Sequence, residues 1–274
     1  MQIRISALFV LRFIGSGVDR PHARRGERHV DLQTDSPPYG TTCKVGCAVR
    51  KSISGGLVEH DVSQGVFVVG RNGPGGVTLL GTAFAVARDR LATAYHVAGA
   101  DDSNLVLVAP KISSLSEYQD TSDTSITLVP LTLAAADPIR DLSIVALPPN
   151  SHVGFPFELG NSDEVPPGAP VMTLGFPHAN FGRMVLTQQQ AHVGARVLIE
   201  NSGQKSKHIV LNTQAREGQS GGPVFDASGH RVVAVLIGSY APGGGGGISL
   251  GGVDPATLHQ TTHAISAEYL GGML

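Results

Sequence analysis

A serine surrounded by glycines carries the strongest chemical signal in the sequence. Ser220 lies within Gly218-Gln219-Ser220-Gly221-Gly222-Pro223, and the apolar residues Val224 and Phe225 follow it. Glycine has no Cβ, so a substrate can approach such a backbone closely. A backbone bent in this way can direct neighbouring N–H groups at one point, where they stabilise an oxyanion. The stretch therefore predicts a serine nucleophile, although a glycine-rich hairpin turn would have the same composition.

A histidine that could act as the base stands well upstream. His96 follows Leu91-Ala92-Thr93-Ala94-Tyr95, whose small and apolar residues predict a buried strand. Imidazole titrates near neutral pH, which suits it to take a proton from a serine hydroxyl. The chain has eleven histidines, so a structural histidine on an apolar strand is the alternative at this position.

Between these two stretches, a carboxylate stands at the start of an apolar run. Asp141 stands where the apolar run Leu142-Ser143-Ile144-Val145 begins, and a carboxylate there would be costly without a hydrogen-bond partner. Asp137 is the second candidate. Its neighbour Pro138 indicates a turn instead, and we therefore favour Asp141.

Taken in order, the three stretches resemble the motifs of the chymotrypsin-fold (trypsin-like) serine peptidases. Thr93-Ala94-x-His96-Val97, preceded by Gly81-Thr82-Ala83-Phe84, resembles the histidine motif, and Asp141-Leu142-Ser143-Ile144 resembles the acid motif. The order His, Asp, Ser differs from that in subtilisins and α/β-hydrolases. The resemblance covers residues 57–270. It implies that Ser220 attacks a peptide carbonyl, that His96 takes its proton and that Asp141 orients the imidazole.

The same resemblance implies further site residues. The backbone N–H groups of Gly218 and Ser220 would form the oxyanion hole, and the cleft would be lined by Thr213, Gln214, Ile237, Gly238 and Ser239. Gln219 stands where secreted members have Asp, and Val97 where they have a disulfide cysteine. Both departures point to the disulfide-free bacterial branch of the family. The loop before Ser220 does not match its relatives in length, so the sequence does not predict the primary specificity.

Short apolar segments separated by glycine, proline and aspartate turns must position these residues. Strands are expected at 65–69, 77–80, 81–87, 91–97, 104–108, 126–131 and 142–147, and again at 171–177, 184–187, 191–199, 208–213 and 231–239. Residues 263–270 resemble the strand and short helix that close the disulfide-free bacterial members. The resemblance implies an all-β fold of two six-stranded antiparallel barrels with the site in the cleft between them. A short helix would end the chain. We expect residues 1–56 to form an extension, poorly ordered or packed as a strap, and 57–150 and 151–274 to form the barrels.

Composition narrows the class of partner. The chain has 274 residues, a formal net charge of −2 and 15% charged residues, so neither nucleic acid nor an anionic membrane is indicated. A polypeptide substrate is the expected partner, and a regulatory protein is the other partner that we consider. Cys43 and Cys47 could form one disulfide but cannot complete a zinc site, and the glycine tract at 243–247 lacks the lysine of a phosphate loop. No metal or cofactor is expected.

The N-terminal segment suggests a location. Its apolar run, residues 7–11, is short for the core of a signal peptide, and Arg12 interrupts it. We therefore expect a cytoplasmic protein rather than a secreted or periplasmic one. Two other functions stay open at this point: a catalytically inactive binding module on the same fold, and an esterase that uses the same three residues.

Overall fold

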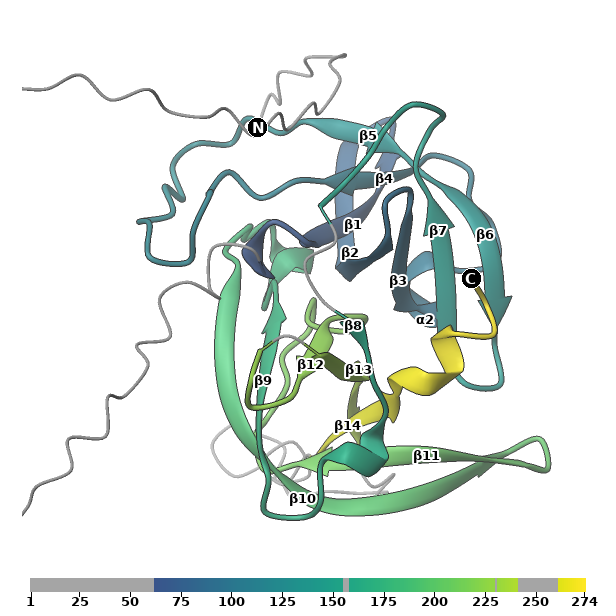
Figure 1. Ribbon diagram of the computed structural model, residues 1–274. Coiled ribbons are helices and arrows are strands. Elements are labelled where there is room, and N and C mark those ends of the chain that lie inside the picture. Colours follow the sequence, from purple (N-terminus) through teal and green to yellow (C-terminus); the bar gives the residue numbers. More distant parts are fainter. Residues whose placement is uncertain (1–61, 155–157, 230, 241–260) are drawn as a thin grey trace, which may run out of the picture. The chain divides into compact units, whose positions relative to one another are not determined.

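The computed structural model describes residues 62–154, 158–229, 231–240 and 261–274, all of which belong to one structural unit (Figure 1). The fold is all-β, as predicted, with two sheets and a few short helices. The predicted extension 1–56, with Cys43 and Cys47, and the glycine tract 243–247 lie outside the described residues. No helix in the described part of the chain is both long and apolar enough to cross a membrane.

The first sheet is strongly curled, and its two edge strands, β5 and β6, follow each other directly along the chain. Its strands run in the order β5-β4-β1-β2-β3-β7-β6. Only Leu131 separates β5 from β6, and its N–H donates to the carbonyl of Leu105 at the start of β4. The strands are β1 (Val66–Gly73), β2 (Gly76–Ala87), β3 (Arg90–Ala94), β4 (Leu105–Val108), β5 (Leu128–Pro130), β6 (Thr132–Asp137) and β7 (Leu142–Ala146).

The second sheet closes into a six-stranded barrel. Its order is β12-β9-β10-β11-β14-β13, and an additional pairing of β12 with β13 completes the ring. The two-residue strand β8 pairs in parallel with the start of β13. The strands are β8 (Glu158–Leu159), β9 (Pro170–Gly175), β10 (Thr187–Asn201), β11 (Gln204–Leu211), β12 (Pro223–Phe225), β13 (Arg231–Tyr240) and β14 (Thr261–Ser266). The strand predicted at 184–187 is therefore a loop that ends where β10 begins.

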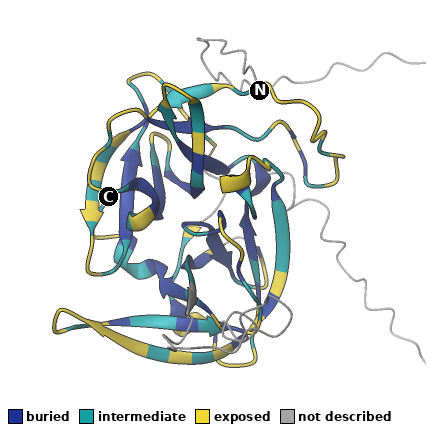
Figure 2. Ribbon diagram, turned by 180° about the vertical axis from the view of Figure 1, so that it is seen from behind, coloured by how far each residue is buried: buried dark blue, intermediate teal, exposed yellow. Residues whose placement is uncertain are grey.

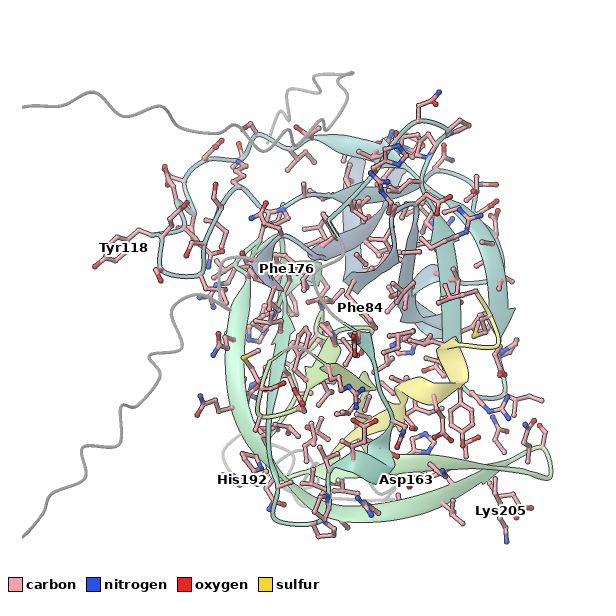
Figure 3. The ribbon with its side chains drawn as sticks, viewed as in Figure 1. Phe84, Tyr118, Asp163, Phe176, His192 and Lys205 are labelled. Atoms are coloured by element: carbon pink, nitrogen blue, oxygen red, sulfur yellow. The ribbon has the colours of Figure 1, made fainter. Side chains whose placement is uncertain are left out.

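Successive side chains of a strand point to opposite faces of its sheet, and the buried apolar ones form three cores. One core fills the first sheet, around Val69 and Leu91, and another fills the second barrel, around Val224 and Leu236. The third includes residues of both sheets, among them Phe84 of β2 and Phe176, which follows β9. Figure 2 shows the buried strands in dark blue, and in Figure 3 Phe84 and Phe176 lie inside the molecule. Burying one such phenylalanine contributes about 1.5–3 kcal/mol.

Four short helices connect the strands in the described residues. They are α2 (Tyr95–Ala98), η1 (Ser162–Glu164), η2 (Ala179–Phe181) and η4 (Ala267–Leu270). The last one is the short C-terminal helix expected from the sequence. It is a 3₁₀ turn that buries Ala267 and Leu270 in the shared core. The helix α2 matters most for the site, because it carries His96.

Candidate active site

Strand register brings His96 and Asp141 together. The strands β3 and β7 are antiparallel, and Ala94 at the end of β3 pairs with Leu142 at the start of β7. The residue after Ala94 therefore lies beside the residue before Leu142, and the N–H of Tyr95 donates to the carbonyl of Asp141 at 3.0 Å. The chain then turns into α2, which places His96 next to the Asp141 side chain.

Both carboxylate oxygens of Asp141 contact His96. The backbone N–H of His96 donates to Oδ1 at 2.8 Å, and the imidazole Nδ1 lies 2.7 Å from Oδ2. A proton held on Nδ1 by the carboxylate leaves Nε2 as the acceptor nitrogen. The imidazole is 49% exposed, so Nε2 is open to a substrate or a nucleophile.

Asp141 adopts a backbone conformation that is uncommon for a residue with a side chain. Its φ is 56°, in the left-handed region, which aspartate tolerates better than most residues. Such conformations cost about 1–3 kcal/mol and are concentrated at functional sites. Hydrogen bonds from Tyr95 and His96 to three different oxygens of Asp141 hold it there.

Asp137, the alternative acid, accepts hydrogen bonds within the turn that follows it and from the side chain of Arg140. Its Oδ1 accepts from the N–H groups of Ile139 and Arg140, and its Oδ2 lies 2.7 Å from Nη1 of Arg140. These contacts fit the turn residue that Pro138 indicated.

Ser220 comes from the second sheet and packs close to the helix that carries His96. Gly81 of β2 separates the two. A Cβ added to Gly81 would lie 2.9 Å from the carbonyl oxygen of Ser220 and 2.6 Å from Val97, the residue after His96. The hydroxyl of Ser220 donates to the carbonyl of Ile237 at 2.9 Å. The hydroxyl must release this carbonyl before it can donate to the imidazole of His96.

The loop around Ser220 requires glycine at two positions. Gly218 and Gly221 have φ of 91° and 83°. A side chain at Gly221 would collide with the carbonyl of Thr82, and one at Gly218 with the carbonyl of Phe176. The two glycines therefore allow the backbone of β2 and the backbone after β9 to approach the Ser220 loop closely.

Two backbone N–H groups of this loop are available to a ligand. No cis peptide bond occurs in the described residues, so each C=O points opposite to the next N–H. The carbonyl of Glu217 accepts from His178, which turns the N–H of Gly218 the other way, and the carbonyl of Gln219 accepts from Gly222, which does the same for Ser220. Within the described part of the chain, neither of these two N–H groups donates to another residue.

Thr82 of β2 holds both ends of this loop. Its hydroxyl donates to the carbonyl of Gly218 at 2.7 Å and accepts from the N–H of Phe176 at 3.2 Å. Its own N–H donates to the carbonyl of Ser220 at 2.9 Å. Thr82 is fully buried. From the sequence it looked like one more residue of an apolar strand, and its only signal was its place in Gly81-Thr82-Ala83-Phe84.

We expect Thr82→Val to lower kcat/KM for a peptide about 10- to 100-fold. Valine keeps the shape but leaves the carbonyl of Gly218 and the N–H of Phe176 without their partner. A buried group in that state costs about 1–3 kcal/mol, and 1.4 kcal/mol corresponds to a factor of ten. Thr82→Ser, which keeps the hydroxyl, should retain most of the rate. Equal rates for Thr82→Val and the unchanged chain, measured on folded protein, would contradict this role.

The residues expected to line the cleft occupy two segments. Ile237 and Gly238 lie on β13 beside Ser220, since Ile237 accepts its hydrogen bond and a Cβ at Gly238 would lie 3.8 Å from its Oγ. Ser239 follows on the same strand, and its side chain is outside what the structure describes. Thr213 is fixed from both sides, because its carbonyl accepts from Thr262 at 2.6 Å and its hydroxyl contacts Nε2 of Gln189. Gln214 follows it and is half-buried.

Comparison with known proteins shows the family. The sequence pattern of the trypsin-like peptidase domain matches residues 81–235, more than half of the chain. The chain belongs to the trypsin-like peptidase family. The matched region runs from the start of the Gly81-Thr82 segment into β13 and includes His96, Asp141 and Ser220. No curated protein sequence matches the chain.

Several bacterial trypsin-like proteases share the fold. The protease Rv3671c from M. tuberculosis, in its active form, is 19% identical, with a TM-score of 0.54 over 88% of this chain and 93% of that one. The HtrA-type protease AlgW with a decapeptide is 16% identical, with a TM-score of 0.57 over 81% of this chain and 66% of that one. The MamO protease domain from Magnetospirillum magneticum is 15% identical, with a TM-score of 0.56 over 78% and 98%.

The fold alone does not separate active from inactive members. Rv3671c in its inactive form also matches, at 19% identity and a TM-score of 0.53, over 80% of this chain and 91% of that one. Function must therefore be argued from the side chains and backbone groups of the site in this trypsin-like peptidase.

Proposed function

We propose that this chain is a serine endopeptidase that hydrolyses peptide bonds through an acyl-enzyme. The observation that carries the proposal is the hydrogen-bonded pair of His96 and Asp141, with the Ser220 loop packed against the helix of that histidine. Polypeptide substrates follow from the peptidase family.

The residues divide the chemistry between them. Ser220 Oγ attacks the carbonyl carbon of the substrate while Nε2 of His96 takes the hydroxyl proton. The resulting imidazolium is stabilised by the carboxylate of Asp141 through Nδ1. The negative charge that develops on the substrate oxygen is met by the N–H groups of Gly218 and Ser220. Loss of one such donor typically costs about 10²–10³ in kcat. His96 then gives its proton to the leaving amine, and water repeats the sequence to release the acid.

Strand β13 offers a backbone edge for the substrate. An extended peptide can add to a sheet through main-chain hydrogen bonds. The residues Ile237, Gly238 and Ser239 are placed for this because Ile237 contacts the hydroxyl of Ser220 directly. A peptide bound in this way could also take the carbonyl of Ile237 as a hydrogen-bond acceptor. The Ser220 hydroxyl would then be released from that carbonyl and could donate to His96.

A fluorogenic protein substrate tests the proposal against its alternatives. An endopeptidase releases internal fragments from labelled casein, whereas an inactive binding module releases none. An esterase that uses the same residues would hydrolyse an activated ester and leave peptides intact. Cleavage of both casein and the ester, lost together on treatment with a fluorophosphonate, is the result we expect.

Gln219 suggests how the loop is kept in order. The residue is 2% exposed, and its Oε1 accepts from the backbone N–H of Arg216 at 2.7 Å. An uncharged amide folded onto its own loop has no ion pair to make with a newly freed amino terminus. The loop conformation described above therefore does not depend on such a partner.

We accordingly expect full activity without proteolytic activation. The intact chain and a chain that begins at Gly56 should give the same active-site titre. Starting at Gly56 leaves Val62, which is buried in the shared core, in place. A titre near zero for the intact chain, restored by cleavage at one defined bond, would show that the protein is made as a zymogen.

A further inference from the structure

A histidine that the proposed mechanism does not use faces the same space as Ser220. His263 of β14 pairs directly with Gly238 of β13. Directly opposed residues of antiparallel strands project to the same face of a sheet. The face of Gly238 is the one toward Ser220, since a Cβ there would have the serine Oγ as its nearest neighbour, at 3.8 Å. The side chain of His263 therefore projects on the face of Ser220, one strand further from it.

The absence of a side chain at Gly238 matters for this placement. Neighbouring strands lie about 4.8 Å apart, so Gly238 leaves an open position between the nucleophile and His263. A Cβ at this position would have only the serine Oγ within 4 Å among the described residues, so the space beside the nucleophile is not filled by a side chain of β13.

A second histidine lies next to the first. His208 of β11 pairs with Ile265 of β14, two residues beyond His263, and so projects to the same face. Burial lowers the pKa of His208 first of all, and the proximity of His263 lowers it further. Burial also lowers the pKa of His263, whose Nε2 lies 3.3 Å from the hydroxyl of Thr261. Two partly buried imidazoles thus lie near each other, and His263 disfavours a charge on His208.

The groups on the surrounding elements set the electrostatics of this position. On β13 the residue opposite is the uncharged Gly238. The segment before Ser220 carries Arg216 and Glu217, both exposed, and the carboxylate of Glu217 accepts a hydrogen bond from Asn180. A carboxylate brought to the imidazoles would offset the cost of charging them, whereas an aliphatic or cationic side chain would not.

On the basis of the proposed peptidase function, we infer that His263, supported by His208, selects substrates with an acidic residue on the amino side of the cleaved bond. The imidazole supplies an N–H donor and, when protonated, a positive charge to the carboxylate of a glutamate or aspartate side chain. Glutamine has nearly the same shape as glutamate but no charge. The difference in kcat/KM between a glutamate and a glutamine substrate therefore measures the contribution of the carboxylate charge.

The selectivity should depend on pH in a definite direction. Protonated His263 binds a carboxylate more strongly than neutral His263, and hydrogen bonds to charged groups are roughly twice as strong as neutral ones. The preference is therefore present below the pKa of the imidazole, which burial has lowered, and it fades as the pH rises above it. The ratio of kcat/KM for glutamate to that for glutamine cancels any effect of pH on the catalytic groups, because both substrates use the same ones.

The test uses four peptides that differ only in that residue: glutamate, aspartate, glutamine and leucine. For the unchanged chain we expect glutamate to exceed glutamine about tenfold in kcat/KM at acidic pH, with the ratio declining as the pH rises through the lowered pKa of His263. His263→Phe should bring the ratio to about one and remove its pH dependence. His192→Phe, a change on the exposed face of β10, is the matched control and should leave the ratio unaltered.

The outcomes separate this inference from the proposed function. Efficient cleavage after leucine or glutamine, with no preference for glutamate at any pH, would overturn the role of His263 and leave the peptidase in place. No cleavage of any of the four peptides, together with no labelling of Ser220, would overturn the proposed function itself. The pH profile of the unchanged chain gives an answer even where the His263→Phe variant fails to fold.

Discussion

Ser220→Ala should lower peptide hydrolysis by on the order of 10⁶-fold, to the level of a chain without a nucleophile. The substitution removes one oxygen. Among the described residues that oxygen makes one hydrogen bond, which it donates to the carbonyl of Ile237. The stability of the fold should change by less than about 1.5 kcal/mol, the worth of one ordinary hydrogen bond.

The loss of activity in Ser220→Ala can be separated from a loss of structure, because Thr82 holds the loop through its backbone. Because the hydrogen bonds of Thr82 reach the carbonyl of Ser220 and not its side chain, Ser220→Ala leaves the loop held as before. The unfolding temperature and the initial rates on casein, measured on the same preparation, separate lost chemistry from lost folding. Activity of Ser220→Ala near that of the unchanged chain would mean that another residue is the nucleophile.

Asp141→Asn should lower kcat by about 10⁴. An asparagine can still accept from the backbone N–H of His96 through its carbonyl oxygen. Its amide group would then face Nδ1 and donate to it, so that the ring proton moves to Nε2. In that tautomer Nε2 cannot take the proton of the serine, although the ring stays in place.

Asp137→Asn is the matched control for this prediction. It makes the same chemical change four residues earlier, in a carboxylate that pairs with Arg140. We expect a small loss of stability and nearly unchanged kcat. A larger fall in kcat for Asp137→Asn than for Asp141→Asn would mean that Asp141 is not the orienting acid.

The sequence was sufficient to predict the fold class and the strands that carry the site. Apolar segments bounded by glycine and proline mark β3 and β7, because a strand is a local pattern of side chains. The pairing of Ala94 with Leu142, which brings His96 to Asp141, is a contact between distant segments. Only the resemblance to the trypsin-like peptidases made that contact predictable.

The role of Thr82 could not be predicted from the sequence pattern around it. A buried threonine in an apolar strand reads as an ordinary β-branched residue. Its two partners, Gly218 and Phe176, belong to the other sheet and are more than ninety positions away. The hydroxyl meets these two partners only when the two sheets are packed together.

The placement of His263 opposite Gly238 depends on a β-bulge that the sequence pattern does not predict. The pairing of β13 with β14 shifts between Leu236 and Gly238, so that Ile237 is an extra residue. Such a bulge changes which residues share a face. A regular ladder would have placed Ile237, and not Gly238, opposite His263, and the open position beside Ser220 would have been filled.

The most direct test of the central claim is labelling of the intact chain with a fluorophosphonate, followed by mapping of the modified residue by mass spectrometry. The probe reacts with a serine that is activated by a neighbouring base and whose adduct is stabilised by an oxyanion hole. The account predicts one phosphonate for each chain, on Ser220, and none after Asp141→Asn within the same reaction time. An intact, folded chain that stays unlabelled at Ser220 would contradict it.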